Sequence, residues 1–284
     1  MKIIKDLFKY DKRFSVGFIF VVLILFMAIL SFFPPYDPTI PHTFPRDLSP
    51  SLKHILGTNS LGQDIFWILT IAVRNSLIIG GISAVISRTL AILIGSLAGY
   101  LGGRVDRVIS TVCDSFVVIP RLPLLILFAF IFRGFLNPLS MAILLGFLDW
   151  AWPSKRYRSQ ILSLKESEFT NTARFSGAYT LEIIAEEHMP FLLSYVVADS
   201  ISGFIWAIGM ETSLSVLGLF DLSIPTLGTT IYWANYYKSM LLGIWWWIGS
   251  PVGALIITVI GLYLLSVGLG DFLDPKVRLQ RLSK

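Results

Sequence analysis

The chain has 284 residues, of which 55% are hydrophobic and only 14% charged, and its mean hydropathy is +0.73. Because a soluble domain carries about 25% charged residues, this composition excludes an ordinary soluble domain and indicates an integral membrane protein. The net charge of +5 does not indicate a nucleic-acid partner, since the basic residues are interspersed with apolar runs of bilayer length. Cys113 is the only cysteine, which excludes an intrachain disulfide and a cysteine-rich metal site.

The first apolar run covers residues 14–33 and contains no charged residue. A helix needs about 20 such residues to cross a bilayer core of about 30 Å. The run is too long for the apolar part of a signal peptide, and no small-residue cleavage site precedes Pro34 and Pro35. We therefore predict an uncleaved first transmembrane helix.

Five later apolar runs predict five further spans, at residues 75–101, 108–132, 139–151, 191–219 and 251–268. The fourth run is short, and the fifth contains Asp199 and Glu211. The predicted fold is an all-α integral membrane protein with six transmembrane helices.

Basic residues predict the orientation of these spans. If the N-terminus lies inside, the cytoplasmic segments hold sixteen of the 23 Lys and Arg residues. By the positive-inside rule both termini are then cytoplasmic, in a multi-pass protein of the cell membrane. The long polar loop at residues 152–190 is predicted to be cytoplasmic too.

That loop resembles a known motif. The spacing of Ala173, Gly177 and Pro190 is that of the EAA loop of binding-protein-dependent ABC importer permeases, which runs Glu-Ala-Ala, three residues, Gly and a distant Leu-Pro. The first two motif positions differ here, because they read Asn171 and Thr172.

Further stretches resemble the C-type permease subunit of dipeptide and oligopeptide importers, over about residues 14–278. The flanks of the loop match at Arg156, Arg158, Leu162, Leu164, Glu168-Phe169 and Ala173-Arg174. The other matches are His54-Ile55-Leu56-Gly57-Thr58-Asn59-Ser60-Leu61-Gly62-Gln63-Asp64 (departing at Ile55, Asn59 and Gln63), Ala98 to Gly103, Val105-Asp106, Glu211 to Leu219 and Asp271 to Lys276.

The resemblance implies the type I ABC importer (MetI-like) permease fold. Residues 1–70 would form the N-terminal tail, first span and extracytoplasmic segment, and residues 71–284 the transmembrane domain with its coupling loop at about 155–190. The implied partners are a homologous permease in a heterodimer, two ABC ATPase subunits, an extracytoplasmic solute-binding protein and membrane lipid. ATP and Mg²⁺ would bind to the ATPases, with no cofactor in this chain.

A short helix at residues 168–175 is predicted within the loop, with Ser167 as its N-cap and Gly177 ending it. In the coupling interpretation Phe169 and Phe175 enter a groove on the ATPase, and Arg174 contacts its rim. The residues implied in coupling are Glu168, Phe169, Asn171, Thr172, Ala173, Arg174, Phe175 and Gly177. The alternative is an amphipathic helix on the lipid surface.

Enzymatic chemistry is not indicated. A P-loop needs a Gly-Lys pair, which the sequence lacks, so ATP hydrolysis must belong to a partner. The three histidines, His42, His54 and His188, fall in loops predicted on opposite faces of the membrane.

Arg88 falls near the middle of the second span, where an ionisable group is costly and faces protein or water. Among Asp114, Asp199 and Glu211, predicted depth favours Asp199 as its partner. A structural pair, a position in the pathway and contact with the partner permease remain open for Arg88, Asp199 and Glu211. Arg121, between Pro120 and Pro123, is predicted to satisfy backbone carbonyls freed by a kink.

Seven aromatic residues fall in the segment 220–250, which is predicted to lie at the outer face: Tyr232, Trp233, Tyr236, Tyr237, Trp245, Trp246 and Trp247. They fit an interfacial aromatic belt, or contacts to the binding protein or to a sugar. Oligopeptides and oligosaccharides both remain candidate solutes. The favoured function is a permease subunit working by alternating access; an ion-coupled secondary transporter and a membrane anchor for a signalling complex are the alternatives.

Overall fold

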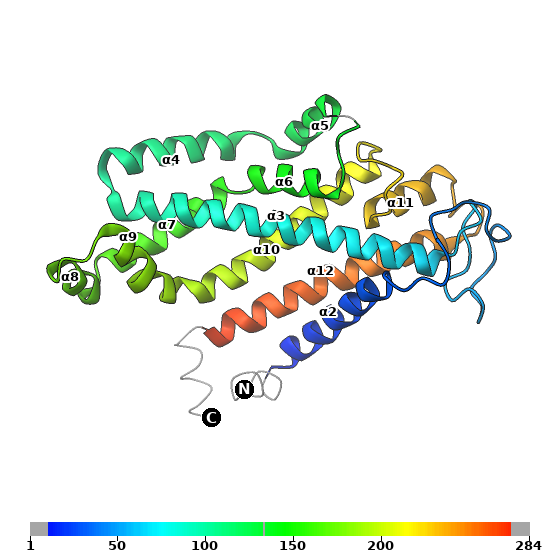
Figure 1. Cartoon of the computed structure of the whole chain (residues 1–284), viewed down its shortest axis with the longest axis horizontal. Coiled ribbons are helices and arrows are strands. Elements are labelled where there is room, and N and C mark those ends of the chain that lie inside the picture. Colours follow the sequence, from blue (N-terminus) through cyan, green and yellow to red (C-terminus); the bar gives the residue numbers. More distant parts are fainter. Residues whose placement is uncertain (1–10, 133, 274–284) are drawn as a thin grey trace.

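The computed structural model describes residues 11–132 and 134–273, and in this part of the chain it is helical, without a β-strand (Figure 1). The predicted all-α fold is therefore confirmed. The helices are α2 (Lys12–Leu30), α3 (Ile65–Leu101), α4 (Gly103–Val118), α5 (Arg121–Ile131), α6 (Pro138–Leu148), α7 (Ala151–Lys165), α8 (Glu168–Phe175), α9 (Thr180–Glu182), the π-helix η1 (Ile183–His188), α10 (Met189–Val216), α11 (Leu227–Tyr236) and α12 (Trp245–Leu273).

Three helices among the described residues are long and apolar enough to cross a membrane, namely α2, α3 and the Trp245–Gly270 part of α12. Two bent pairs bring the number to as many as five: α4 with α5, and Thr180–Leu193 with Tyr195–Val216. Helix α6 has 11 residues and spans only about 16 Å. The count of six thus stays a prediction, as does the placement of both termini.

The third predicted span, 108–132, is not one continuous helix. Helices α4 and α5 meet at an angle of 81°. The break lies at Ile119 and Pro120, whose backbones are extended. Proline disfavours the helical conformation of the residue before it and lacks the N–H of a helical hydrogen bond, so Pro120 explains why α4 stops.

Helix α3 begins ten residues before the predicted start of the second span. Its N-cap is Asp64, whose carboxylate accepts a hydrogen bond from the backbone N–H of Phe66 at 2.9 Å. The apolar run alone did not reveal this start because polar residues such as Arg74 and Asn75 lie inside the helix. With 37 residues, α3 is about 55 Å long, and it runs through the middle of the molecule (Figure 1).

Helices α2 and α12 pack closely through glycines. A Cβ atom on Gly17 would lie 2.8 Å from the backbone nitrogen of Leu265, and one on Gly261 would lie 2.8 Å from Phe20 Cβ. Small residues let transmembrane helices approach in this way. The pair places α2 at one edge of the bundle (Figure 1).

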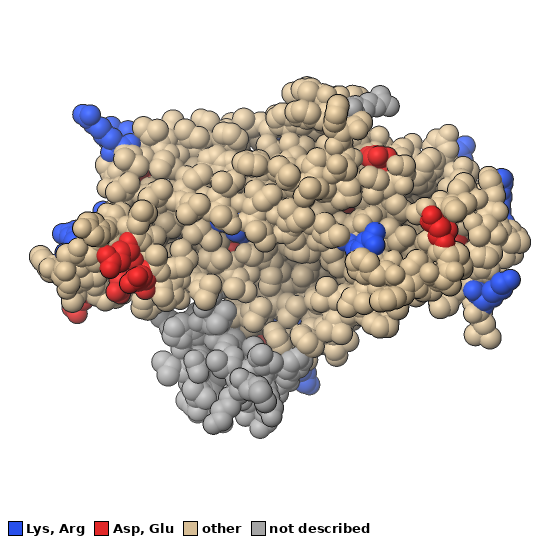
Figure 2. Space-filling model, viewed as in Figure 1, with Lys and Arg blue, Asp and Glu red and all other residues tan. Residues whose placement is uncertain are grey.

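The molecule has two distinct ends along its long axis. Helices α8 and α9 form one end, and α11 with the segment 36–64 forms the other (Figure 1). On the face shown in Figure 2, most charged side chains lie toward these two ends and the middle is largely uncharged. This distribution fits a molecule whose middle lies in lipid.

Candidate functional site

Helix α8 has the predicted bounds, Glu168–Phe175. Ser167 occupies the N-cap position, although its hydroxyl makes no capping hydrogen bond. At the other end Gly177 has φ +87°, its N–H donates to the Arg174 carbonyl at 3.2 Å, and the Ala178 N–H donates to the Ala173 carbonyl at 3.2 Å. This is a Schellman motif, which favours glycine at its left-handed position.

Thr170 fixes α8 to its neighbours. Its hydroxyl lies 2.8 Å from the carbonyl oxygen of Leu164, at the end of α7, and 2.9 Å from Nε2 of the buried His188, at the end of η1. The hydroxyl has one hydrogen and the carbonyl can only accept, so His188 Nε2 must carry a hydrogen and donate it to Thr170. The contact clamps α8 between α7 and η1.

Two more side chains of α8 face the protein interior. The ring of Phe169 stacks on Phe191 of α10, with centroids 5.0 Å apart, and its edge contacts the His188 ring. Ala173 packs against a buried cluster that includes Tyr100, Ile161 and Leu192. Of the two predicted aromatic anchors, Phe169 is therefore engaged within this chain, and Phe175 is free for a partner.

Three large aromatic or apolar side chains at this end are exposed. Phe175 is 87% exposed, Tyr179 80% and Leu181 68%; we call these three residues the docking patch. Tyr179 and Leu181 were not among the predicted site residues, and the only signal for them was an apolar side chain inside a polar loop. The exposed polar residues near the patch along the chain include Glu168, Asn171, Thr172, Arg174, Ser176, Glu182 and Glu186. Figure 2 shows acidic side chains gathered at this end of the molecule.

Arg88 in α3 lies in a buried ion-pair network. Its Nε lies 2.8 Å from Oδ2 of Asp199 in α10, and its Nη1 lies 2.7 Å from Oδ2 of Asp149. Asp199 is the partner that predicted depth favoured. Asp149 was not considered from the sequence, because it follows α6 at the corner to α7 and only the tertiary structure brings that corner against α3.

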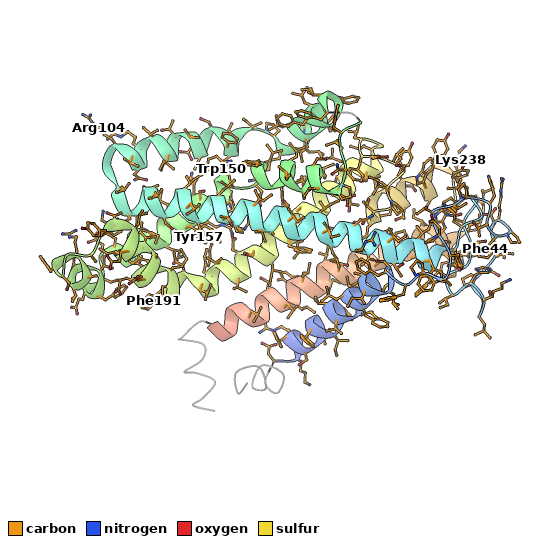
Figure 3. All side chains as sticks on the ribbon, in the orientation of Figure 1. Phe44, Arg104, Trp150, Tyr157, Phe191 and Lys238 are labelled. Atoms are coloured by element: carbon orange, nitrogen blue, oxygen red, sulfur yellow. The ribbon has the colours of Figure 1, made fainter. Side chains whose placement is uncertain are left out.

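Three more side chains complete the network. Arg121 Nη1 lies 2.7 Å from Asp149 Oδ1, so its partner is a carboxylate and not the backbone carbonyls that the sequence suggested. Arg156 Nη2 lies 2.5 Å from Asp199 Oδ1, and the Tyr157 hydroxyl donates to Asp199 Oδ2 at 3.1 Å. Figure 3 labels Tyr157 where α7 lies beside α3. The network thus joins α3, α5, α7 and α10.

Glu211 is fully buried and does not contact this network. Its carboxylate accepts hydrogen bonds from the hydroxyls of Thr226 at 2.6 Å, Ser215 at 2.7 Å and Ser76 at 3.3 Å. Ser76 in turn accepts from the Leu227 N–H at 3.0 Å. Glu211 therefore ties α10 to α3 and to the start of α11. The third candidate, Asp114, pairs with Lys155.

At the opposite end, the stretch 54–64 builds the start of α3. His54 Nδ1 lies 2.7 Å from Asp64 Oδ2, and the Tyr36 hydroxyl donates to the same oxygen at 3.0 Å. Burial of the Tyr36 ring, together with the charge of Asp64, raises the pKa of the Tyr36 hydroxyl well above its ordinary value. The contacts of this stretch therefore hold Asp64 in place as the N-cap of α3.

The aromatic residues near this end have mixed roles. Tyr236 and Trp245 are exposed, as an interfacial belt requires, whereas Trp247 is buried and the Trp233 N–H donates to the Leu222 carbonyl. Residues 11–132 and 134–273 contain no group of three or more His, Cys, Asp or Glu side chains that could hold a metal ion.

Comparison with known proteins extends these observations. Residues 91–279 match the family model described as binding-protein-dependent transport system inner membrane component. The chain is 30% identical to the oligopeptide transport system permease protein OppC of Bacillus subtilis, over 95% of this chain and 88% of the relative. It is 31% identical to OppC of Mycobacterium tuberculosis H37Rv, over 94% and 91%, and 32% identical to the nickel transport system permease protein NikC of Escherichia coli K12, over 94% and 96%.

Proposed function

Because this chain belongs to the family of binding-protein-dependent transport system inner membrane components, we propose that helix α8 transmits movement between a partner ATPase and the membrane-spanning helices. The chain is the permease subunit of an ABC importer and a multi-pass membrane protein. It is not itself an enzyme, since ATP hydrolysis belongs to separate subunits.

The observation that carries this proposal is the docking patch on a rigid support. Exposed apolar side chains grouped at one place on a protein mark an interaction site. Phe175 belongs to α8, which is fixed by Thr170 and His188 on one side and by Phe169 and Phe191 on the other. Tyr179 and Leu181 follow at the start of α9. A push on Phe175 is therefore passed to α7 and α10 instead of being absorbed by a mobile loop.

The charges around the patch favour a protein partner over the lipid surface. A helix that lies on a membrane carries Lys and Arg on its polar face. Here Glu168, Glu182 and Glu186 are exposed near the patch, and Arg174 is the only basic residue of α8. The proposed partner is an ATPase with an apolar groove and a basic rim.

The rest of the assembly follows from the same proposal. The α8 end faces the cytoplasm and two ATPases, which bind ATP and Mg²⁺. The end with α11 faces outward and receives solute from an extracytoplasmic binding protein. A homologous permease supplies the other half of the pathway. We take short peptides as the solute, since the relatives named OppC are oligopeptide permeases; nickel, in the name of another relative, and oligosaccharides are the other candidates.

The test uses the whole importer, reconstituted in proteoliposomes with its partner permease, both ATPases and the binding protein. We expect solute-loaded binding protein to raise the ATPase rate and uptake to require ATP. Two results together would show that this chain works as an ion-coupled transporter. Uptake would be driven by a proton gradient without ATP, and the ATPase rate would be the same with and without the binding protein.

A further inference from the structure

The ion-pair network around Arg88 carries more positive than negative charge. Among the described residues it joins three guanidinium groups, Arg88, Arg121 and Arg156, to two carboxylates, Asp149 and Asp199. An uncompensated charge in the membrane part of a protein is costly unless it faces water or an anion. One guanidinium of the network therefore has capacity for another anionic group.

Arg88 is not the guanidinium with this spare capacity. Its side chain is 5% exposed, and it contacts both carboxylates as well as the Ser87 hydroxyl and the Asp199 carbonyl. Arg156 contacts Asp199 and the Tyr195 hydroxyl. It lies on α7 beside Lys155 and Arg158, which pair with carboxylates of α4. Arg156 thus lies at the start of the segment predicted as the coupling loop, about 155–190.

Arg121 has the geometry of an incomplete site. Its side chain is 25% exposed, and only Nη1 is engaged, by Asp149. The other donors, Nε and Nη2, donate to no described residue. The guanidinium carbon lies 5.2 Å from the centroid of the Trp206 ring. An aromatic ring beneath a guanidinium holds its plane in place and leaves the edge donors free.

The position of Arg121 adds to this argument. It begins α5 directly after the 81° break from α4, and α5 packs against α10, which supplies Trp206. A break in a membrane helix is tolerated where it lies in protein or lines an aqueous cavity. On α10, Ser202 and Gly209 lie about one turn before and after Trp206, and both are exposed, so the surface of α10 next to Trp206 carries small residues.

We propose that Arg121, supported by Trp206 and Asp149, binds a carboxylate of the transported solute inside the pathway. A planar guanidinium with two free N–H groups matches a carboxylate in a two-point contact. The inference rests on the proposed importer function and names part of the substrate class: peptides with a free C-terminal carboxylate or an acidic side chain. Trp206 and Asp149 act as positioning residues.

The test compares two peptides in the reconstituted importer. They have the same sequence without Asp or Glu, and one ends in a free carboxylate and the other in an amide. For each variant, the uptake ratio of acid to amide is divided by the wild-type ratio, so the preference of the shared binding protein cancels. We expect Arg121→Gln to lower this ratio about tenfold, the order of a charge-assisted hydrogen bond. A third peptide, amidated but with one Glu, separates the terminal carboxylate from an acidic side chain.

The control variant is Arg156→Gln, which removes the other partly exposed guanidinium of the same network. It is expected to lower uptake of both peptides by the same factor. Arg121→Lys keeps a positive charge beside Asp149 but loses the two-point contact, and is expected to lower the ratio by a smaller factor. Arg121→Lys also decides the matter if Arg121→Gln does not assemble.

The outcomes are distinct. If the ratio stays at the wild-type value in Arg121→Gln, or in Arg121→Lys where only that variant assembles, Arg121 binds no solute carboxylate and the inference is wrong. The same holds if Arg156→Gln changes the ratio as strongly as the Arg121 variant. If the wild-type importer takes up none of the three peptides while its ATPase ignores the binding protein, the proposed function itself fails.

Discussion

Arg88 Nε and Asp199 Oδ2 lie 2.8 Å apart, although 111 residues separate the two side chains along the chain. The contact is possible because Gly203, one turn after Asp199 on α10, leaves space for the guanidinium. A Cβ atom at Gly203 would lie 2.5 Å from Arg88 Nη2 and 2.6 Å from Cζ. Gly203 does not have a left-handed backbone, so a glycine is needed at this position only because it has no side chain to occupy the space of the Arg88 guanidinium.

Gly203→Ala should destabilise the protein. The guanidinium is held by two carboxylates and cannot move away freely, and overpacking of this kind costs about 1–3 kcal/mol. The measurement is the midpoint of thermal unfolding of the purified importer in detergent. Gly209→Ala is the matched control, because it lies on the same helix with no atom within 4 Å of its Cβ position. Equal midpoints for the two variants would contradict a role of Gly203 in seating Arg88.

Phe175→Ser should weaken binding of the ATPase without destabilising this chain. Its ring is almost fully exposed, so the folded permease loses no internal contact. We expect less ATPase to co-purify and the binding protein to stimulate hydrolysis less. Phe169→Ala provides the contrast, because it removes the stack on Phe191 and should also make the loop at residues 166–190 more sensitive to protease. If Phe175→Ser leaves ATPase binding unchanged, the docking patch is not the contact.

Gly177→Val should uncouple transport from ATP hydrolysis. Gly177 has φ +87° and open space around its Cβ position, so the cost is backbone strain alone, about 1–2 kcal/mol, and is concentrated where α8 ends. Gly177→Asn should be nearly normal, since asparagine tolerates the left-handed conformation. The ratio of solute moved to ATP hydrolysed checks this, at equal membrane levels of both variants. Normal uptake in the Val variant would remove the case for Gly177 in coupling.

The segment 36–64 should lose stability at alkaline pH, because the Tyr36 hydroxyl donates a hydrogen bond to Asp64. Burial and the Asp64 carboxylate raise the pKa of its hydroxyl, so the stabilising contact is fully present below pH about 10, the ordinary tyrosine value, and is lost as the pH rises beyond it. Proteolysis of this segment between pH 8 and 11 should therefore increase more steeply in the wild type than in Tyr36→Phe. Tyr263→Phe, at an exposed tyrosine elsewhere, should behave like the wild type.

In the coupling loop, the sequence predicted the ends of helix α8 but not the directions of its side chains. Glu168 and Gly177 marked the two ends of α8 because a helix N-terminus favours acidic residues and a left-handed C-terminus favours glycine. The direction in which each side chain of α8 points could not be obtained in the same way. Phe169 turned inward to Phe191 and Phe175 outward, since that choice depends on where η1 and α10 lie.

The sequence by itself determined that this chain is a helical membrane protein of the importer permease family, because apolar run length and motif spacing are local properties of the chain. The sequence also reduced the acidic partners considered for Arg88 to three and favoured Asp199 among them. Only the tertiary structure decided that Asp149 joins Asp199 in that network and that Arg121 rests on Trp206. It also decided that, among the described residues, two nitrogens of Arg121 have no acceptor and Glu211 binds hydroxyls. These contacts form between helices far apart along the chain, and their packing, unlike their length or composition, is set by the whole bundle.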